Sequence, residues 1–120
     1  MHKISYSNTA YITDQNISDI LVTAFEGGIN YWTNTPIRVD EWPDEAEFAS
    51  DVVGKGVPVY IMNEEDQKWE KLTLPNLLNS IRWYLTTYNK TVDIFENGEY
   101  DADTADIIVQ YALFGEVVYG

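Results

Sequence analysis

Apolar residues recur at helical spacing in the first third of the chain. Thr13 or Asp14 can cap a helix there, because short polar side chains accept hydrogen bonds from the first free backbone amides. Its apolar face follows spacings of three and four residues and comprises Ile17, Leu21, Ala24, Gly28 and Tyr31. A glycine on a buried face lets a neighbour approach closely. We therefore expect close packing at Gly28, whereas Gly27 costs about 1 kcal/mol of helix propensity relative to alanine.

Two later segments show the same periodicity. A helix is predicted from Leu74, with Thr73 as its cap and Pro75 in its first turn. Its apolar face comprises Leu77, Leu78, Ile81, Tyr84, Leu85 and Tyr88. The last helix is predicted from about Ala102 to Phe114, and its apolar residues cover more than one face. Such a helix belongs at the centre of the molecule.

The acidic segment 44–53 is a fourth candidate helix. Pro43 precedes it, and Asp44 with Glu47 has the spacing of a capping box, in which two side chains satisfy backbone amides reciprocally.

Alternating patterns predict strands at 57–63 and 68–72 around the acidic turn 64–67, which together indicate a β-hairpin. Pro58 favours an edge position for the first strand, since proline has no amide hydrogen to donate. The dipeptide at 97–98, Asn-Gly, predicts a short hairpin or a tight loop. Residues 116–120 are predicted as a final strand that joins the hairpin. The expected fold is α+β: one domain, 1–120, with three or four helices packed on one small antiparallel sheet.

Composition supports a single folded domain. The chain has 120 residues, 45% of them hydrophobic, with 4 tryptophans, 9 tyrosines and 4 phenylalanines, enough apolar surface for one core. Cysteine is absent, which excludes disulfides and thiolate metal sites. No apolar run approaches the ~20 residues that span a bilayer, and the first residues are too polar for a signal peptide. We expect a cytoplasmic protein.

The net charge restricts the possible partners of the protein more than any other property of its composition. Seven basic and 20 acidic residues give a formal net charge of −13. Nucleic-acid backbones and anionic membranes repel such a chain, so neither is an expected partner. An electrostatically favoured partner is a basic protein.

Catalytic and metal-binding motifs are weak. The lone histidine, His2, lies beside the N-terminus. A hydrolase of the serine–histidine type needs a histidine that is held by a rigid scaffold. Segment 93–104 approximates a calcium loop, but Phe95 stands where an oxygen ligand is required and Thr104 where a bidentate glutamate is required. No phosphate-binding glycine loop is present in the sequence. We expect neither an enzyme nor a cofactor or metal site.

The strongest functional pattern is an acidic run in residues 40–51, which contain six acids and no base. A second run comes after Lys90, with seven acids and no base. On a helix, Asp40, Asp44, Glu47 and Asp51 would share one face, whose charges roughly imitate a phosphate track. Either run alone is more typical of a solvated surface than of a binding site, but two such runs in a domain with a net charge of −13 favour a function. The predicted partner-binding residues are Asp40, Glu41, Trp42, Asp44, Glu45, Glu47 and Asp51, with Trp42 as a hydrophobic anchor.

Two stretches resemble a known family. The stretches "ILVTAFEGGINYW" (20–32) and "ADIIVQYALFGEVVYG" (105–120) are similar to a family of small acidic proteins that bacteriophages and prophages encode, chiefly in Gram-positive hosts. The family has no established activity, so the resemblance implies no catalytic residue. It implies an origin in accessory phage regions, where small proteins often antagonise host defence, and a location in the host bacterial cytoplasm.

These observations lead to one expected function and two alternatives. The first is an inhibitor of anti-CRISPR or anti-restriction type, which mimics DNA and blocks a basic host nuclease or restriction complex without catalysis. The second is a sponge for a defence signalling nucleotide, with an aromatic pocket at Asn30, Tyr31 and Trp32. Only two arginines, Arg38 and Arg82, are present to offset the phosphates of such a ligand. The third is a structural or regulatory phage protein. The sequence leaves the oligomeric state open.

Overall fold

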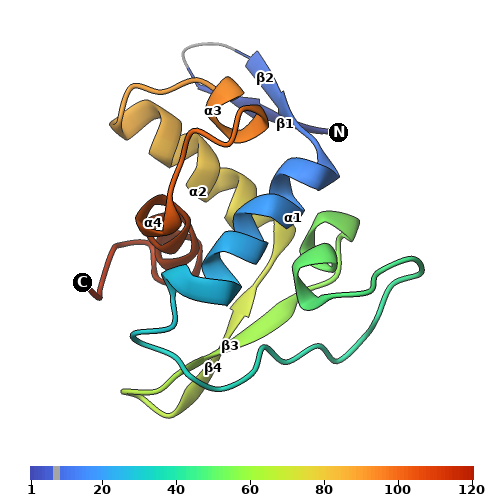
Figure 1. Ribbon diagram of the computed structural model, residues 1–120, viewed down its shortest axis with the longest axis vertical. Coiled ribbons are helices and arrows are strands. Elements are labelled where there is room, and N and C mark those ends of the chain that lie inside the picture. Colours follow the sequence, from blue (N-terminus) through green and yellow to red (C-terminus); the bar gives the residue numbers. More distant parts are fainter. Residues whose placement is uncertain (7–8) are drawn as a thin grey trace.

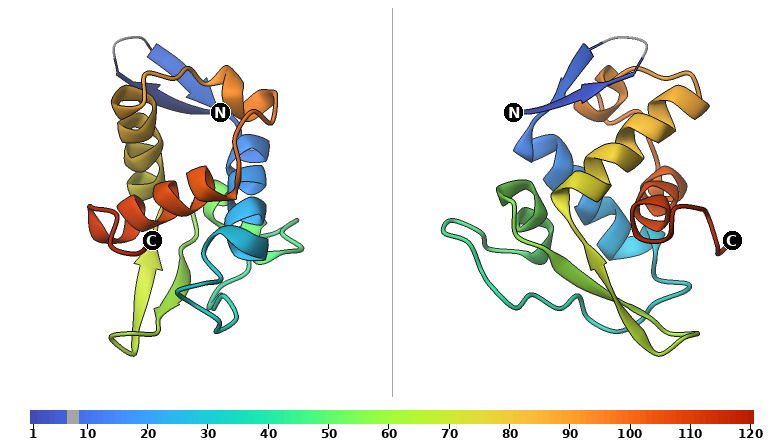
Figure 2. Two further views of the ribbon diagram at one scale, coloured as in Figure 1. Left: turned by 60° about the vertical axis from the view of Figure 1, so that its left-hand side comes forward. Right: turned by 180° about the vertical axis from the view of Figure 1, so that it is seen from behind.

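The computed structural model describes residues 1–6 and 9–120. Within them, the longest helices are α1 (Asp14–Thr23), α2 (Leu74–Thr87) and α4 (Ala102–Phe114), and they meet at the centre of the molecule (Figure 1). Helix α4 runs across both α1 and α2 (Figure 2). The predicted caps are confirmed at Thr13 and Thr73, whose side chains accept hydrogen bonds from the backbone amides three residues later.

Helix α1 continues directly into a single π-helical turn, η1 (Ala24–Gly28). The close packing expected at Gly28 is confirmed, because a Cβ placed there would lie 2.6 Å from the carbonyl oxygen of Ala102 in α4. At Gly27 a Cβ would meet nothing within 4 Å. The predicted apolar face is wrong at its end: the helix stops before Tyr31, which is 58% exposed.

Two hairpins lie at opposite ends of the helices (Figure 1). Strand β1 (His2–Ser5) pairs antiparallel with β2 (Thr9–Ile12), and β3 (Val59–Asn63) pairs antiparallel with β4 (Lys68–Leu72). The α+β class and the second hairpin are confirmed. The described strands form two small sheets, whereas the sequence predicted one, because the N-terminal hairpin was not foreseen.

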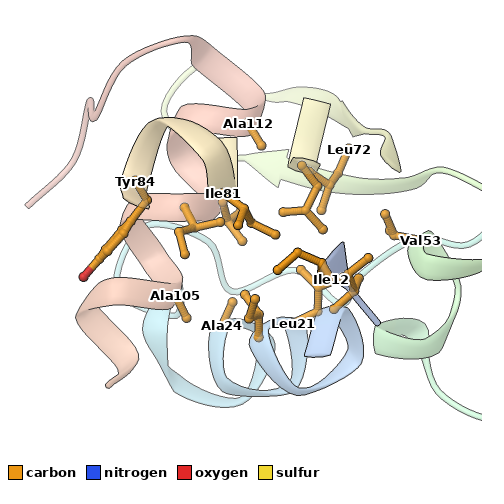
Figure 3. Packing of buried hydrophobic residues seen from close by; sticks show 14 of the residues in the cluster. Ile12, Leu21, Ala24, Val53, Leu72, Ile81, Tyr84, Ala105 and Ala112 are labelled. Atoms are coloured by element: carbon orange, nitrogen blue, oxygen red, sulfur yellow. The ribbon is translucent and has the colours of Figure 1, made fainter. Parts of the chain in front are cut away.

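The core lies between the helices and is closed by both hairpins (Figure 3). Isoleucine and leucine dominate it, with Ile12 contributed by β2, Leu21 by α1, Leu72 by β4 and Ile81 by α2, each 0% exposed. Because each element contributes only one apolar face, none of them could bury its surface alone. This shared core fixes where the polar surface of each element points.

Two further sequence predictions are wrong, and one choice between alternatives is decided. Segment 44–53 is not a helix; two short 3₁₀ turns, η2 (Ala49–Asp51) and η3 (Val53–Lys55), form near its C-terminal end instead. The segment after Lys90 forms a short helix, α3 (Asp93–Glu96), and then a tight turn in which Gly98 has φ 66°, so the loop alternative holds and the hairpin does not. Residues 116–120 form no strand, because Gln110 binds this segment through its side chain.

Candidate functional site

Residues 40–48, here called the acidic loop, lie in the segment between η1 and η2. Just before the loop, Arg38 exchanges two backbone hydrogen bonds of 2.9 Å with Tyr60 at the free edge of β3. A turn comes next, closed by a hydrogen bond from the amide of Ala46 to the carbonyl of Pro43. Within that turn Glu45 has φ 66°, which no right-handed helix accommodates. This conformation explains why the predicted helix is absent.

The predicted partner-binding residues separate into two groups. Glu41, Asp44, Glu45 and Glu47 are exposed, and across residues 1–6 and 9–120 their side chains have no hydrogen-bond or ion-pair partner. Trp42 is also exposed, at 53%. Asp40 and Asp51, by contrast, have partners of their own. The expected single face of four carboxylates is therefore wrong.

Asp40 is neutralised by its neighbour Arg38. Two hydrogen bonds of 2.8 Å run from the guanidinium to the two carboxylate oxygens. The hydrogen bonds and the charge of Arg38 lower the pKa of Asp40. The guanidinium also lies 4.6 Å from the ring centre of Tyr60, so Arg38 is held on the molecule.

Asp51 holds the end of the acidic loop in place. Its carboxylate accepts hydrogen bonds from the hydroxyl of Ser18 in α1, at 2.8 Å, and from the amides of Glu47 and Phe48, at 3.2 and 3.1 Å. The hydroxyl of Ser18 is the main cause of the lowered pKa of Asp51. Asp51 therefore fixes the loop against α1 and is not an open contact residue.

Helix α1 lies between the two acidic runs (Figure 1). On one side, Asp14 shares a shallow cavity with Glu45, Glu47 and Lys55. On the other, Asp19 shares a cavity with Glu96 of α3. We call Asp14, Asp19, Glu45, Glu47 and Glu96 the acidic band.

The contribution of α1 to this band was not predicted. Asp14 and Asp19 lie on the polar side of a helix whose apolar positions Ile17 and Leu21 were predicted correctly, so the helical period carried the signal. Two basic side chains stand at one edge of the band: Lys55, and His2, whose ring nitrogen lies 2.6 Å from Asp14.

Tyr31 and Trp32, proposed for a ligand pocket, bind a carboxylate of the protein itself. Asp106 of α4 is 6% exposed and accepts hydrogen bonds from the hydroxyl of Tyr31, at 2.6 Å, and the indole of Trp32, at 2.8 Å. Asp106 accepts a third hydrogen bond, also of 2.8 Å, from the side-chain amide of Gln110. Desolvation and, next, the bond to Asp106 raise the pKa of Tyr31 to about 12. Each hydrogen bond satisfies a buried polar group.

The same cluster anchors the C-terminal segment. The buried side chain of Gln110 accepts hydrogen bonds of 2.8 Å from the amides of Val118 and Tyr119. The ring of Tyr119 stacks on Trp32 with 5.2 Å between ring centres. Trp32 is thus 6% exposed and enclosed by protein.

Asn30 is not brought together with Tyr31 and Trp32 in one pocket. It lines a cavity of about 320 Å³ with Phe25 and Thr33, whereas Tyr31 lines another, of about 390 Å³, with Asp103 and Asp106. Neither cavity has a lysine or arginine among its described lining residues. Carboxylates beside Tyr31 disfavour an anionic ligand.

The described part of the chain contains no group of three or more histidine, aspartate or glutamate side chains able to hold a metal ion. No described helix combines the length and apolarity that crossing a bilayer requires. No protein-family model matches the chain, and neither curated proteins nor solved structures give a significant match.

Proposed function

We propose that the chain is a phage-encoded inhibitor of a host defence system that acts without catalysis by binding a basic nucleic-acid-binding protein. The contact surface is the acidic loop together with the acidic band. One observation supports this most: Glu41, Asp44, Glu45 and Glu47 are exposed and have no partner in residues 1–6 and 9–120. Charges that stabilise nothing within the fold are available to a partner.

The loop is also held in place at both ends. Arg38 fixes its start to β3 and Asp51 fixes its end to α1. A fixed array of carboxylates costs less ordering entropy on binding than a disordered acidic tail would. A basic channel for nucleic acid attracts such an array, and steering of this kind brings association to about 10⁸ M⁻¹s⁻¹ at low salt.

The experiment begins with the target. Host proteins retained on the immobilised chain at low salt are identified by mass spectrometry, and the recovered basic protein is used in kinetic binding measurements at several salt concentrations. The test variant carries Glu41→Gln, Asp44→Asn, Glu45→Gln and Glu47→Gln. We expect its association to be at least severalfold slower and less dependent on salt, since the variant attracts fewer counter-charges.

A matched control removes the same number of charges elsewhere. It carries Glu65→Gln, Glu99→Gln, Asp103→Asn and Glu116→Gln, all at exposed positions outside the loop. If both variants lose association rate equally, net charge and not this surface drives binding. If neither variant differs from the parent at any salt concentration, the proposal fails.

A nucleotide sponge is less well supported. Trp32 is enclosed by Tyr119 and bound to Asp106, and the cavities beside Asn30 and Tyr31 offer no cationic lining residue among those described. Phosphates need such residues or helix N-termini.

A further inference from the structure

An apolar groove of about 370 Å³ lies beside the acidic loop. Val22 of α1 and Phe25 of η1 line it together with Ile37, which precedes the acidic loop, and Phe48, the last residue of the loop. The volume of the groove is at the lower end of the ~300–1,000 Å³ range of small-ligand pockets, so it suits an inserted side chain.

Phe48 is the most exposed aromatic side chain in the described residues, at 65%. Its backbone is nonetheless fixed, because its amide donates to Asp51, which also binds Ser18 of α1. A rigid aromatic surface loses little entropy on binding, which is typical of residues that dominate binding energy. The π-helical turn that carries Phe25 is a second unusual feature, and such turns are frequent at functional sites.

Acidic side chains surround this groove. Among its described lining residues Glu26 alone is charged, Glu47 precedes Phe48, and Asp19 is one turn before Val22 on α1; all three acids are exposed. The nearest base in the sequence, Arg38 beside Ile37, is bound to Asp40. An apolar groove with a negative rim complements a segment that has an apolar side chain between lysines or arginines.

We propose that this groove receives a large apolar side chain from a basic segment of the protein partner. The inference rests on the proposed function and deepens it: the acidic loop and band attract the basic partner, and the groove fixes the register of binding. Charge complementarity mainly raises the association rate constant, whereas filling an apolar pocket lowers the dissociation rate constant.

The test selects 12-residue peptides from a random displayed library on the parent chain. Binding of selected synthetic peptides is then measured with the parent, Phe48→Ala and a control, Tyr11→Ala. Tyr11 is comparably exposed, at 54%, but lies on β2 at the far end of the molecule (Figure 1). We expect selected peptides to combine lysine or arginine with tryptophan, phenylalanine or leucine, and Phe48→Ala to weaken them at least tenfold while Tyr11→Ala leaves them unchanged.

The outcomes separate the groove from the acidic surface. Peptides that are basic without a shared apolar residue, or that bind Phe48→Ala as tightly as the parent, overturn the groove proposal and leave the acidic inhibitor standing. Peptides that bind through Phe48 but are unaffected by neutralising the loop acids support the groove and contradict the proposed function. If selection enriches no peptide, or peptide resonance shifts in NMR spectra fall outside the groove, the groove proposal is wrong.

Discussion

The acidic loop and the cluster around Asp106 place the same chemical group in opposite surroundings. In the loop, Glu41 and Asp44 are exposed and bind nothing else in the described chain. In the cluster, one buried carboxylate accepts hydrogen bonds from Tyr31, Trp32 and Gln110. A carboxylate is costly to bury unless its hydrogen bonds are satisfied, and Asp106 meets that condition. The comparison separates acids that maintain the fold from acids that remain available to a partner.

Asp51 is intermediate between the two regions. It belongs to the acidic run by sequence, but its hydrogen bonds to Ser18 and to two backbone amides give it a structural part like that of Asp106. Charge in the sequence therefore does not identify a contact residue; the partners of each carboxylate do.

The largest effect is expected from Asp106→Ala. It leaves the buried indole of Trp32 without an acceptor and removes one of the three acceptors of the Gln110 side-chain amide, which should lower the free energy of unfolding by up to about 3 kcal/mol. Urea unfolding measures the loss, and Asp44→Ala is the matched control in the acidic loop. A loss below about 1 kcal/mol would mean that the cluster is not structural.

Gly28→Leu should have the next largest effect. The backbone oxygen of Ala102 cannot move aside like a flexible side chain, so the added side chain should separate η1 from α4 and destabilise the fold by about 1 to 3 kcal/mol. Gly27→Ala is the control, because a Cβ there meets nothing within 4 Å; it should be neutral or stabilising by up to about 1 kcal/mol. Thermal unfolding of both variants tests the pair. Equal stabilities would show that close approach at Gly28 does not matter.

Asp51→Asn should cost roughly 1 kcal/mol at pH 7, comparable to the loss of a helix cap. The folded-state pKa of Asp51 is lowered, so its contribution is fully present above the unfolded pKa of about 4 and is lost as the pH falls through the folded value. The stability difference between the parent and Asp51→Asn should accordingly shrink as the pH falls from about 5 through the lowered folded pKa of Asp51. A stability difference that is independent of pH would assign the effect to packing. Glu41→Gln is the control, because the side chain of Glu41 has no hydrogen-bond partner among the described residues.

The smallest effect on stability is expected from neutralising the loop acids. The variant with Glu41→Gln, Asp44→Asn, Glu45→Gln and Glu47→Gln loses no described side-chain hydrogen bond, and like charges no longer repel one another. Its melting temperature should equal or slightly exceed that of the parent, in contrast to Asp106→Ala. A clear fall in melting temperature would show that the loop acids contribute to the stability of the fold.

Local signals were enough to predict much of the fold. Several features depend only on residues close together in the sequence, and each is found where the pattern indicated. They are the helix caps Thr13 and Thr73, the strand 68–72 and the end of α4 at Gly115. Periodicity likewise placed Gly28 on a buried face. A Cβ at this position would lie 2.6 Å from the carbonyl oxygen of Ala102, which explains why the position requires glycine. The alternating pattern was too weak to reveal β1 and β2; β1 packs against α2, which lies far away in the sequence.

Only the tertiary structure decided how the acids are used. Asp44 and Glu47 have the spacing of a capping box, yet Asp51 takes the amide of Glu47 because Ser18, 33 residues away, holds its carboxylate. Trp32 and Asp106 meet across 74 residues, and no helical or strand period relates positions so far apart. By itself the sequence determined that this protein is acidic, α+β and built on three main helices. Which carboxylates are satisfied within the fold and which remain exposed depends on contacts between distant segments, because a hydrogen bond forms between neighbours in space whatever their separation along the chain.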